Sequence, residues 1–454
     1  MSRRNILWII TLVLVAPAVV YLVIAGPVGT ALTAKQMCSL TFVSGLAPER
    51  AFSTYVRPLI GPGAWLVSYD IDRVRQHAAA DLFGFAEATA IHHPGYGCVL
   101  LQQKSPEDVA AILTKYEAKL PPVWGVNQKQ RGTHFDNTAL TAALDSALAA
   151  PGTLAVLVVH GGELVAERYA DGVDGDTPLP GWSMSKTMTT VLAGMLAQRK
   201  FLTTDEVGLF SDWKDDDRVH VSLDQLLRMT SGIDILENKT GADTNSMMLF
   251  QHGNTSAYAI GRGLRETPGE VFAYTSGSTL LVSRLLTDRL GGPGPMLDFI
   301  RDELFAPLDM HHTWFEPDES GQFVGSSFIM SSAHDWARFG QLLQNRGRVN
   351  GRLYFNASWI DYMTTPTPQA TTRPYGAGVW LTDPEHPEQH WMQKLPPDTY
   401  YASGLQTNQL WVIPSRNLVI VRLGATSNFF KSGVIELLQA VLAAQIDPYT
   451  QSST

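Results

Sequence analysis

Hydrophobic and polar positions divide the chain into a long apolar run at the N-terminus, a region of weak periodicity, and a larger part with strand patterns at both ends. The apolar run, Ile6 to Ala25, is twenty positions without a charge and follows Arg3 and Arg4. A helix of ~20 apolar residues crosses a bilayer, whereas the core of a cleaved secretory signal is usually about 7–15 residues. We therefore favour a retained signal anchor over residues 1–26. A cleaved signal is the alternative, with Gly29-Thr30-Ala31 as its cleavage motif.

Positive charge before an apolar span favours the cytoplasmic side for that end of the chain. The remainder is then expected outside the cytoplasm. We predict a single-pass protein of a bacterial-type inner membrane, with its folded part in the periplasm or outside the cell.

The larger part begins and ends with hairpin patterns. Residues 154–159 and 164–169 are apolar strand runs joined by His160-Gly161-Gly162, and residues 410–413 and 418–423 repeat the pattern around Pro414. A helical pattern follows over Val434 to Gln445, and residues 183–365 are mostly helical patterns. This order predicts an α+β fold, in which one antiparallel sheet is completed from distant segments, is flanked by helices and carries an inserted helical region.

Between the anchor and this part, periodicity is weak. The clearest element is a helix expected over Glu107 to Leu120, and Pro121-Pro122 with the polar residues 127–131 marks a boundary. We expect an N-terminal extension over 27–125, the main domain over 126–447 and a tail over 448–454. The extension either wraps the main domain or holds it away from the membrane.

Composition excludes some partners, and the cysteine content raises the question of whether a disulfide forms. The net charge is −9 without any basic run, so a nucleic-acid partner is not expected. Asp215-Asp216-Asp217 is flanked by Lys214 and Arg218, which is typical of a solvated loop rather than a metal site. The two cysteines, Cys38 and Cys98, lie beyond the anchor in an oxidising compartment, where a disulfide is favoured. Two buried free thiols are the alternative, and spacing does not choose between them.

The candidate chemistry begins at Ser183. Lys186 lies three residues later at the start of a predicted helix, so the two side chains share a face, whereas Ser185 cannot face Ser183. A desolvated lysine can take the proton from a serine hydroxyl, and free N–H groups at the helix start can stabilise an oxyanion. The alternative is a capping serine followed by a solvated lysine.

Three later segments supply partners for this serine. Tyr274 and Ser276 follow the turn Pro268-Gly269 and precede a helix over Leu280 to Leu290, so a phenol can meet the Ser/Lys pair and move protons. The segment Leu226 to Ile233 predicts a helix end capped by Gly232. Residues 401–406 contain Gly404-Leu405, where a substrate acyl group can lie against the backbone. The alternative for Tyr274 is an ordinary half-buried loop tyrosine.

With these four segments in order, residues from about 130 to 447 resemble the β-lactamase-related serine hydrolases. That family includes class C β-lactamases, DD-peptidases, esterases and aminohexanoate-oligomer (nylon-oligomer) hydrolases. The stretches Leu304 to Met310 and Asp335 to Gly340 are similar to the esterase and nylon-oligomer branch. The resemblance implies a β-lactamase/transpeptidase-like fold.

It also implies roles for particular residues. Ser183 matches the acylated nucleophile, Lys186 the residue that assists its deprotonation, and Tyr274 the tyrosine that shuttles the proton. Ser276 stands where many relatives have Asn. Gly404-Leu405-Gln406 replaces Lys-Thr-Gly, so this motif has no cation for a substrate carboxylate, which counts against penicillins and D-Ala-D-Ala peptides. The nylon-oligomer branch has an aliphatic residue at the place of Leu405.

The resulting expectation is hydrolysis of a small-molecule ester or amide through an acyl-enzyme, without a metal or organic cofactor. The backbone N–H groups of Ser183 and Leu405 form the oxyanion hole, and Trp182, Ser276 and Gly404 contact the substrate. Trp182 is alternatively ordinary core. Two rival functions are a DD-peptidase or β-lactamase, and a membrane-anchored binding or sensor protein without turnover.

Overall fold

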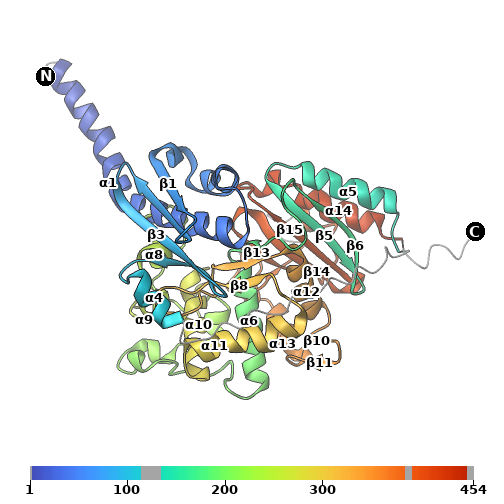
Figure 1. Cartoon of the computed structure of the whole chain (residues 1–454). Coiled ribbons are helices and arrows are strands. Elements are labelled where there is room, and N and C mark those ends of the chain that lie inside the picture. The colour runs from blue at the N-terminus through green and yellow to red at the C-terminus, as the bar shows by residue number, and fades with distance from the viewer. Residues whose placement is uncertain (1–2, 114–133, 384–390, 447–454) are drawn as a thin grey trace, which may run out of the picture.

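The computed structural model describes residues 3–113, 134–383 and 391–446. Its centre is a six-stranded antiparallel sheet in the order β12-β13-β14-β15-β5-β6 (Figure 1). Strand β15 pairs directly with β5, so the sheet is completed from segments far apart in the sequence, as the hairpin patterns predicted. The strands are β5 (Thr153–His160), β6 (Glu163–Tyr169), β12 (Trp380–Leu381), β13 (Tyr400–Gly404), β14 (Asn408–Ile413) and β15 (Leu418–Gly424).

Helices cover both faces of this sheet because its strands are apolar on both sides. In β14, Trp411 and Ile413 belong to the cluster with helices α5 (Asn137–Ala149) and α14 (Val434–Ala444). The alternate residues Leu410 and Val412 belong to the cluster on the other face, with α6 (Met184–Gln198) and α12 (Ala333–Gln344). Figure 1 shows α5 and α14 lying together on their side of the sheet.

The segment between the two hairpins is largely helical, as predicted. It contains a small sheet in the order β7-β9-β8 and the short hairpin β10-β11. The predicted helix end at Gly232 is wrong, because α7 ends at Leu227; Gly232 instead has a φ of 72° in the loop beyond. The elements are α7 (Leu223–Leu227), α8 (Thr244–Gln251), α9 (Thr255–Ile260), α10 (Ser276–Leu290), α11 (Pro293–Phe299), α13 (Ala357–Thr364), β7 (Leu179–Pro180), β8 (Thr313–Phe315), β9 (Ile329–Ser331), β10 (Arg348–Val349) and β11 (Arg352–Leu353).

One helix dominates the N-terminal region. Helix α1 (Arg3–Cys38) runs without a break across the boundary expected after residue 26, and its first part projects from the body (Figure 1). Residues Val19–Val43 are long and apolar enough to cross a membrane, by length and composition. The side chain of Val23 is 69% exposed, whereas Met37 is fully buried, so the same helix leaves the body at one end and is part of the core at the other.

The extension also contains a four-stranded antiparallel meander, β1 (Val67–Asp72), β2 (His77–Leu82), β3 (Phe85–His93) and β4 (Gly97–Leu101). Alanines on the helix-facing side, Ala78, Ala80 and Ala90, are buried and let α1 approach the sheet closely. Because alanine has little strand preference, these strands gave weak periodicity. The helix expected over 107–120 is α4 (Pro106–Leu113), and residues 114–120 lie outside the described ranges. Short helices α2 (Pro48–Ala51), α3 (Arg57–Ile60) and η3 (Gly61–Leu66) precede the meander.

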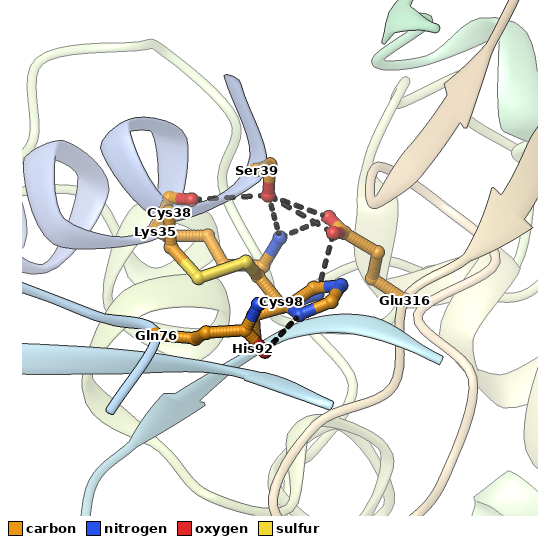
Figure 2. Close-up of a disulfide and its surroundings, with 7 residues drawn as sticks. All are labelled: Lys35, Cys38, Ser39, Gln76, His92, Cys98 and Glu316. Atoms are coloured by element: carbon orange, nitrogen blue, oxygen red, sulfur yellow. Dashed lines mark hydrogen bonds and ion pairs between the residues drawn. A yellow bond between two sulfur atoms is a disulfide. The ribbon is translucent and has the colours of Figure 1, made fainter. Parts of the chain in front are cut away.

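A buried polar cluster joins the extension to the main domain. Cys38, at the end of α1, forms a disulfide with Cys98 in β4 (Figure 2). Beside it, the Lys35 ammonium forms an ion pair with Glu316, and the backbone N–H of Cys98 donates to Glu316 Oε1 at 2.6 Å. Ser39 Oγ donates to Glu316 Oε2 at 2.9 Å. Because Glu316 belongs to the main domain, its buried carboxylate ties the extension onto that domain.

A second glutamate repeats this arrangement. The backbone N–H of Gln102 donates to Glu319 Oε2 at 2.7 Å, and the N–H groups of Gln103 and Lys104 donate to the same carboxylate. Both carboxylates therefore accept hydrogen bonds from the backbone that begins or follows β4. The extension packs against the main domain, which is the first of the two roles that the sequence left open.

Candidate active site

Ser183 lies at a sharp turn between β7 and α6. Trp182, just before it, has a φ of 50°, a left-handed conformation that is unfavourable for a bulky residue. Gly181 is held by a hydrogen bond from its N–H to the Ile329 carbonyl at 2.9 Å, and a Cβ there would lie 2.6 Å from the Trp336 ring. The turn thus has no room for a larger residue at 181, and it presents Ser183 as the N-cap of α6.

Lys186 is buried directly behind Ser183. Its Nζ donates to Ser183 Oγ at 3.0 Å, to Ser276 Oγ at 3.0 Å and to the Ser326 carbonyl at 3.1 Å. The residue is 2% exposed, so it is not the solvated lysine of the alternative interpretation. Burial lowers the pKa of Lys186 to about 8, against the opposing influence of Glu237; Lys239 lowers it further. The neutral amine, which can accept a proton, is therefore accessible near physiological pH.

Tyr274 completes the group. Lys186 Nζ lies 4.8 Å from the centre of its ring, and the Ser183 side chain lies close enough to the Tyr274 phenol to lower its pKa, against the larger effect of burial. Trp380 packs against the ring at a centroid distance of 5.2 Å. Burial raises the pKa of the Tyr274 phenol, and the negative charge of Glu237 raises it further. The tyrosine is therefore a neutral phenol in the resting site.

Glu237, which the sequence gave no reason to select, organises the neighbouring loop. Both the backbone N–H and the hydroxyl of Ser276 donate to Glu237 Oε2, at 2.9 and 3.0 Å. Asn245 Oδ1 accepts a second bond from the same N–H at 3.1 Å. The Ala273 N–H donates to the Met229 carbonyl at 2.8 Å, so the segment after α7 holds the loop from its other side. An isolated glutamate in a polar loop carries no periodic or motif signal.

Gly404 and Leu405 lie beside the turn that carries Ser183. A Cβ on Gly404 would collide with the Gly181 carbonyl oxygen and lie 3.2 Å from the Trp182 Cβ, so the end of β13 runs directly against residues 181–182. In the described part of the chain, neither the Ser183 nor the Leu405 backbone N–H donates to an acceptor. Both residues line one pocket, so these two N–H groups are available to a substrate oxygen.

That pocket has a volume of about 760 Å³ and collects the sequence-predicted residues. Ser183, Tyr274, Ser276, Trp182, Gly404 and Leu405 all line it, and Lys186 lies beneath Ser183. Trp182 is both 5% exposed and part of the lining, so the two interpretations of it are compatible. No group of three or more His, Cys, Asp or Glu suited to a metal ion occurs within the described ranges.

Two cations on the lining were missed from the sequence. Arg373 stacks on Trp380, with its guanidinium carbon 3.9 Å from the ring centre, and donates to the Tyr401 hydroxyl at 2.9 Å. Lys239 lines the same pocket. The Gly404-Leu405-Gln406 motif itself holds no cation, but Arg373 reaches the same strand from a different loop. No sequence rule links position 373 to strand β13.

Comparison with known proteins agrees with this architecture. The family description "Beta-lactamase" matches residues 140–445. Similar solved structures include a putative 6-aminohexanoate-dimer hydrolase from Bacillus anthracis, with 20% identity over 73% of this chain and 88% of that one and a TM-score of 0.55. EstCE1, a hydrolase with promiscuous acyltransferase activity, has 15% identity over 67% and 99% of the two chains and a TM-score of 0.54. A class C β-lactamase has 15% identity over 69% and 99%, with a TM-score of 0.52.

No curated protein matches the chain. The solved structures confirm the predicted β-lactamase/transpeptidase-like fold, in which antiparallel sheets are flanked by helices. The matched family covers about two thirds of the sequence and includes every segment of the pocket from Trp182 to Leu405. The chain therefore belongs to the β-lactamase family, as its ordered motifs indicated.

Proposed function

We propose that the protein is a serine hydrolase that cleaves an ester or amide through an acyl-enzyme on Ser183. The observation that carries this proposal is the convergence of Ser183, Lys186 and Tyr274 at one pocket, with a 3.0 Å hydrogen bond between Lys186 Nζ and Ser183 Oγ. A serine that is hydrogen-bonded to a buried lysine and has a phenol beside it possesses the base and proton carrier that nucleophilic catalysis needs.

The two shifted pKa values suggest a division of work. Lys186, with its pKa near 8, takes the proton as Ser183 Oγ attacks the carbonyl carbon. The N–H groups of Ser183 and Leu405 hold the oxyanion. Tyr274, which is neutral, relays a proton to the leaving alcohol or amine. Water then attacks the acyl-enzyme along the same path in reverse and releases the acid.

We also propose that α1 anchors the protein in a bacterial-type inner membrane, with the pocket outside the cytoplasm. Three observations support this placement: the uncharged run Ile6 to Ala25 in the first part of the helix, the arginines Arg3 and Arg4 before that run, and the disulfide between Cys38 and Cys98.

The proposal is tested with the full chain, p-nitrophenyl butyrate and a fluorophosphonate probe. We expect ester turnover and labelling of Ser183, and Ser183→Ala should abolish both. Ser185→Ala is the matched control, because Ser185 is buried two positions away and its hydroxyl donates to the Trp182 carbonyl at 2.7 Å. Absence of both turnover and labelling in the wild type would favour the binding or sensor alternative.

The position of Arg373 supports one alternative function. A guanidinium on the pocket wall can bind a carboxylate, the group that β-lactams and D-Ala-D-Ala peptides present. A DD-peptidase or β-lactamase is therefore the second candidate. Turnover of a chromogenic cephalosporin that Arg373→Ala weakens through KM would support it. Turnover of esters alone supports the esterase.

A further inference from the structure

The pocket around Ser183 extends far beyond the catalytic residues, along helix α1. Its lining includes Leu22, Ala25, Gly29 and Leu32, which recur every three or four residues and so share one face of the helix. Leu22 is exposed where the helix leaves the body, whereas Val28, also on the lining, is 4% exposed. One face of α1 therefore forms a wall that leads from the surface into the interior.

A second apolar part of the lining also comes from the extension, whereas Glu237, Lys239, Thr240, Asn245 and Ser246 of the main domain give the pocket a polar side. Leu59, Ile60, Leu66 and Leu82 line the pocket and are half-buried. A volume of about 760 Å³ lies within the range of sites that enclose a drug-sized ligand. An acetyl or butyryl group would fill only a small part of it, and the apolar walls that α1 and the extension contribute suit a hydrocarbon chain.

Two large aromatic side chains are exposed next to lining residues of this pocket. Trp65 and Phe83 are 74% and 65% exposed, and they are the sequence neighbours of the lining residues Leu66 and Leu82. Their ring centroids are 6.3 Å apart. A Cβ on Gly26 of α1 would lie 3.0 Å from Leu82 Cδ2, so Phe83 follows a residue that packs on α1 just where the helix becomes exposed. Exposed aromatic residues beside an apolar span are typical of the interface between membrane and water.

We infer that the substrate is a bilayer lipid with a long acyl chain in ester or amide linkage, which enters from the membrane surface with its chain along α1 and its carbonyl at Ser183. This inference rests on the proposed hydrolase function. Each methylene group transferred from water to an apolar wall favours binding by about fourfold. Binding from the bilayer, where the chain is already out of water, depends instead on the apolar wall being continuous with the membrane.

The chemical step balances without a further reactant. Ser183 Oγ forms a bond to the acyl carbon, the bond from that carbon to the head-group oxygen or nitrogen breaks, and the leaving group takes the proton. Water then cleaves the acyl-enzyme, which releases a free fatty acid and restores the Ser183 hydroxyl.

Gly29 offers a selective test. It lines the pocket, and a Cβ built on it meets nothing within 4 Å. Gly29→Phe should therefore place a ring inside the apolar part while the catalytic residues stay in position. Gly263→Phe is the matched control, since Gly263 is exposed, also has open space around its Cβ and does not line the pocket.

The full chain is reconstituted in vesicles of phosphatidylethanolamine and phosphatidylglycerol, and fatty acid release is followed by mass spectrometry. The same preparation is assayed with p-nitrophenyl esters of four, eight and twelve carbons. For the wild type we expect fatty acid release and a kcat/KM that rises at least tenfold from four to twelve carbons. Gly29→Phe should keep the four-carbon activity and lose at least tenfold on the twelve-carbon ester and the vesicles. Gly263→Phe should match the wild type.

Every other outcome of this experiment would contradict one specific part of the inference. A kcat/KM that is flat or falls with chain length, or equal loss on all esters in a folded Gly29→Phe protein, overturns the acyl-chain assignment and leaves the hydrolase standing. Turnover of the twelve-carbon ester without release from vesicles overturns the bilayer as the source. Failure of every ester and of Ser183 labelling overturns the proposed function itself. If Gly29→Phe does not fold, Ala25→Phe, one turn nearer the mouth, takes its place.

Discussion

Two charged residues near Lys186 shift its pKa in opposite directions. Glu237 raises the pKa of Lys186 and Lys239 lowers it, while burial lowers it most. Because the proposed mechanism uses the neutral amine of Lys186 as the base, kcat/KM should increase as the pH rises through about 8. Glu237→Gln removes the charge that favours the ammonium, so this rise should move to lower pH. Lys239→Gln should move it to higher pH.

The measurement is the pH profile of kcat/KM for a soluble ester in the three proteins. Glutamine keeps an oxygen that can accept from Ser276, so the loop geometry is retained in Glu237→Gln. Identical profiles in all three proteins would show that Lys186 is not the base that limits the rate.

Gly404 tests the backbone of the oxyanion hole. A methyl group at this position collides with the Gly181 carbonyl, so Gly404→Ala must move β13 away from the nucleophile's turn. A displacement of about 1 Å at reacting groups can cost roughly 10²-fold in rate, and we expect a loss of that order in kcat. Gly263→Ala, at an exposed glycine with open space, should keep full activity. A Gly404→Ala protein with normal kcat would argue against this strand as the oxyanion donor.

At this scale the sequence identified residues that belong to short motifs and missed those that act through the fold. Ser183 and Lys186 are fixed by helical spacing, and Tyr274 and Leu405 by the order of the motifs, and the structure brings all four to one pocket. Glu237 and Arg373 were not predicted as site residues, because a single charged residue in a loop belongs to no periodic pattern or motif. Their importance comes only from the residues that tertiary packing places beside them.

Among the elements, the predictable ones were strands with β-branched or large apolar residues and helices with clear periodicity. Strands β5, β6, β14 and β15 and helix α14 agree with their patterns to within a few residues. The meander β1–β4 was missed because alanines take the buried positions of β2 and β3, where they give little contrast with polar neighbours. Helix α1 packs across the meander and needs small side chains at these positions. The sequence of one strand does not show that a helix will pack on it.

The disulfide should contribute strongly to the stability of this extension. Cys38 and Cys98 are 60 positions apart, and closing a loop of that length stabilises the folded state by about 4 kcal/mol in the chain-entropy account. The double substitution Cys38→Ala with Cys98→Ala should therefore lower the melting temperature by several degrees. Thermal unfolding followed by circular dichroism measures this, and reduced wild type should match the double variant. Equal melting temperatures for the oxidised and reduced wild type would contradict it.

For the molecule as a whole, the extension and the main domain form one packed unit. Ser44 Oγ donates to the Pro178 carbonyl at 2.6 Å, and Gln406 Nε2 donates to the Tyr55 carbonyl at 2.9 Å. The first bond fixes the chain just before Ser183, and the second fixes the residue that follows Leu405. The main domain alone would also expose the carboxylates of Glu316 and Glu319 without their partners.

A chain reduced to residues 134–454 should therefore be unstable and at least tenfold less active than the full chain. A chain that begins at residue 19 keeps every contact described for the extension and should label at Ser183 as the full chain does. The comparison uses fluorophosphonate labelling at equal protein concentration, with thermal unfolding as the control for folding. Full labelling of the shorter chain would show that the extension serves the membrane alone.

The pairing of β15 with β5 also has a consequence for synthesis. The nucleophile's turn leaves the ribosome 222 residues before Leu405 (405 − 183), and the sheet that carries Leu405 closes only when β15 reaches β5. At about 5–20 residues per second, roughly 10 to 45 seconds separate the two. During that interval Ser183 and Lys186 are present without the segment that completes the proposed oxyanion hole. The proposed activity therefore cannot begin before β15 has emerged and paired with β5.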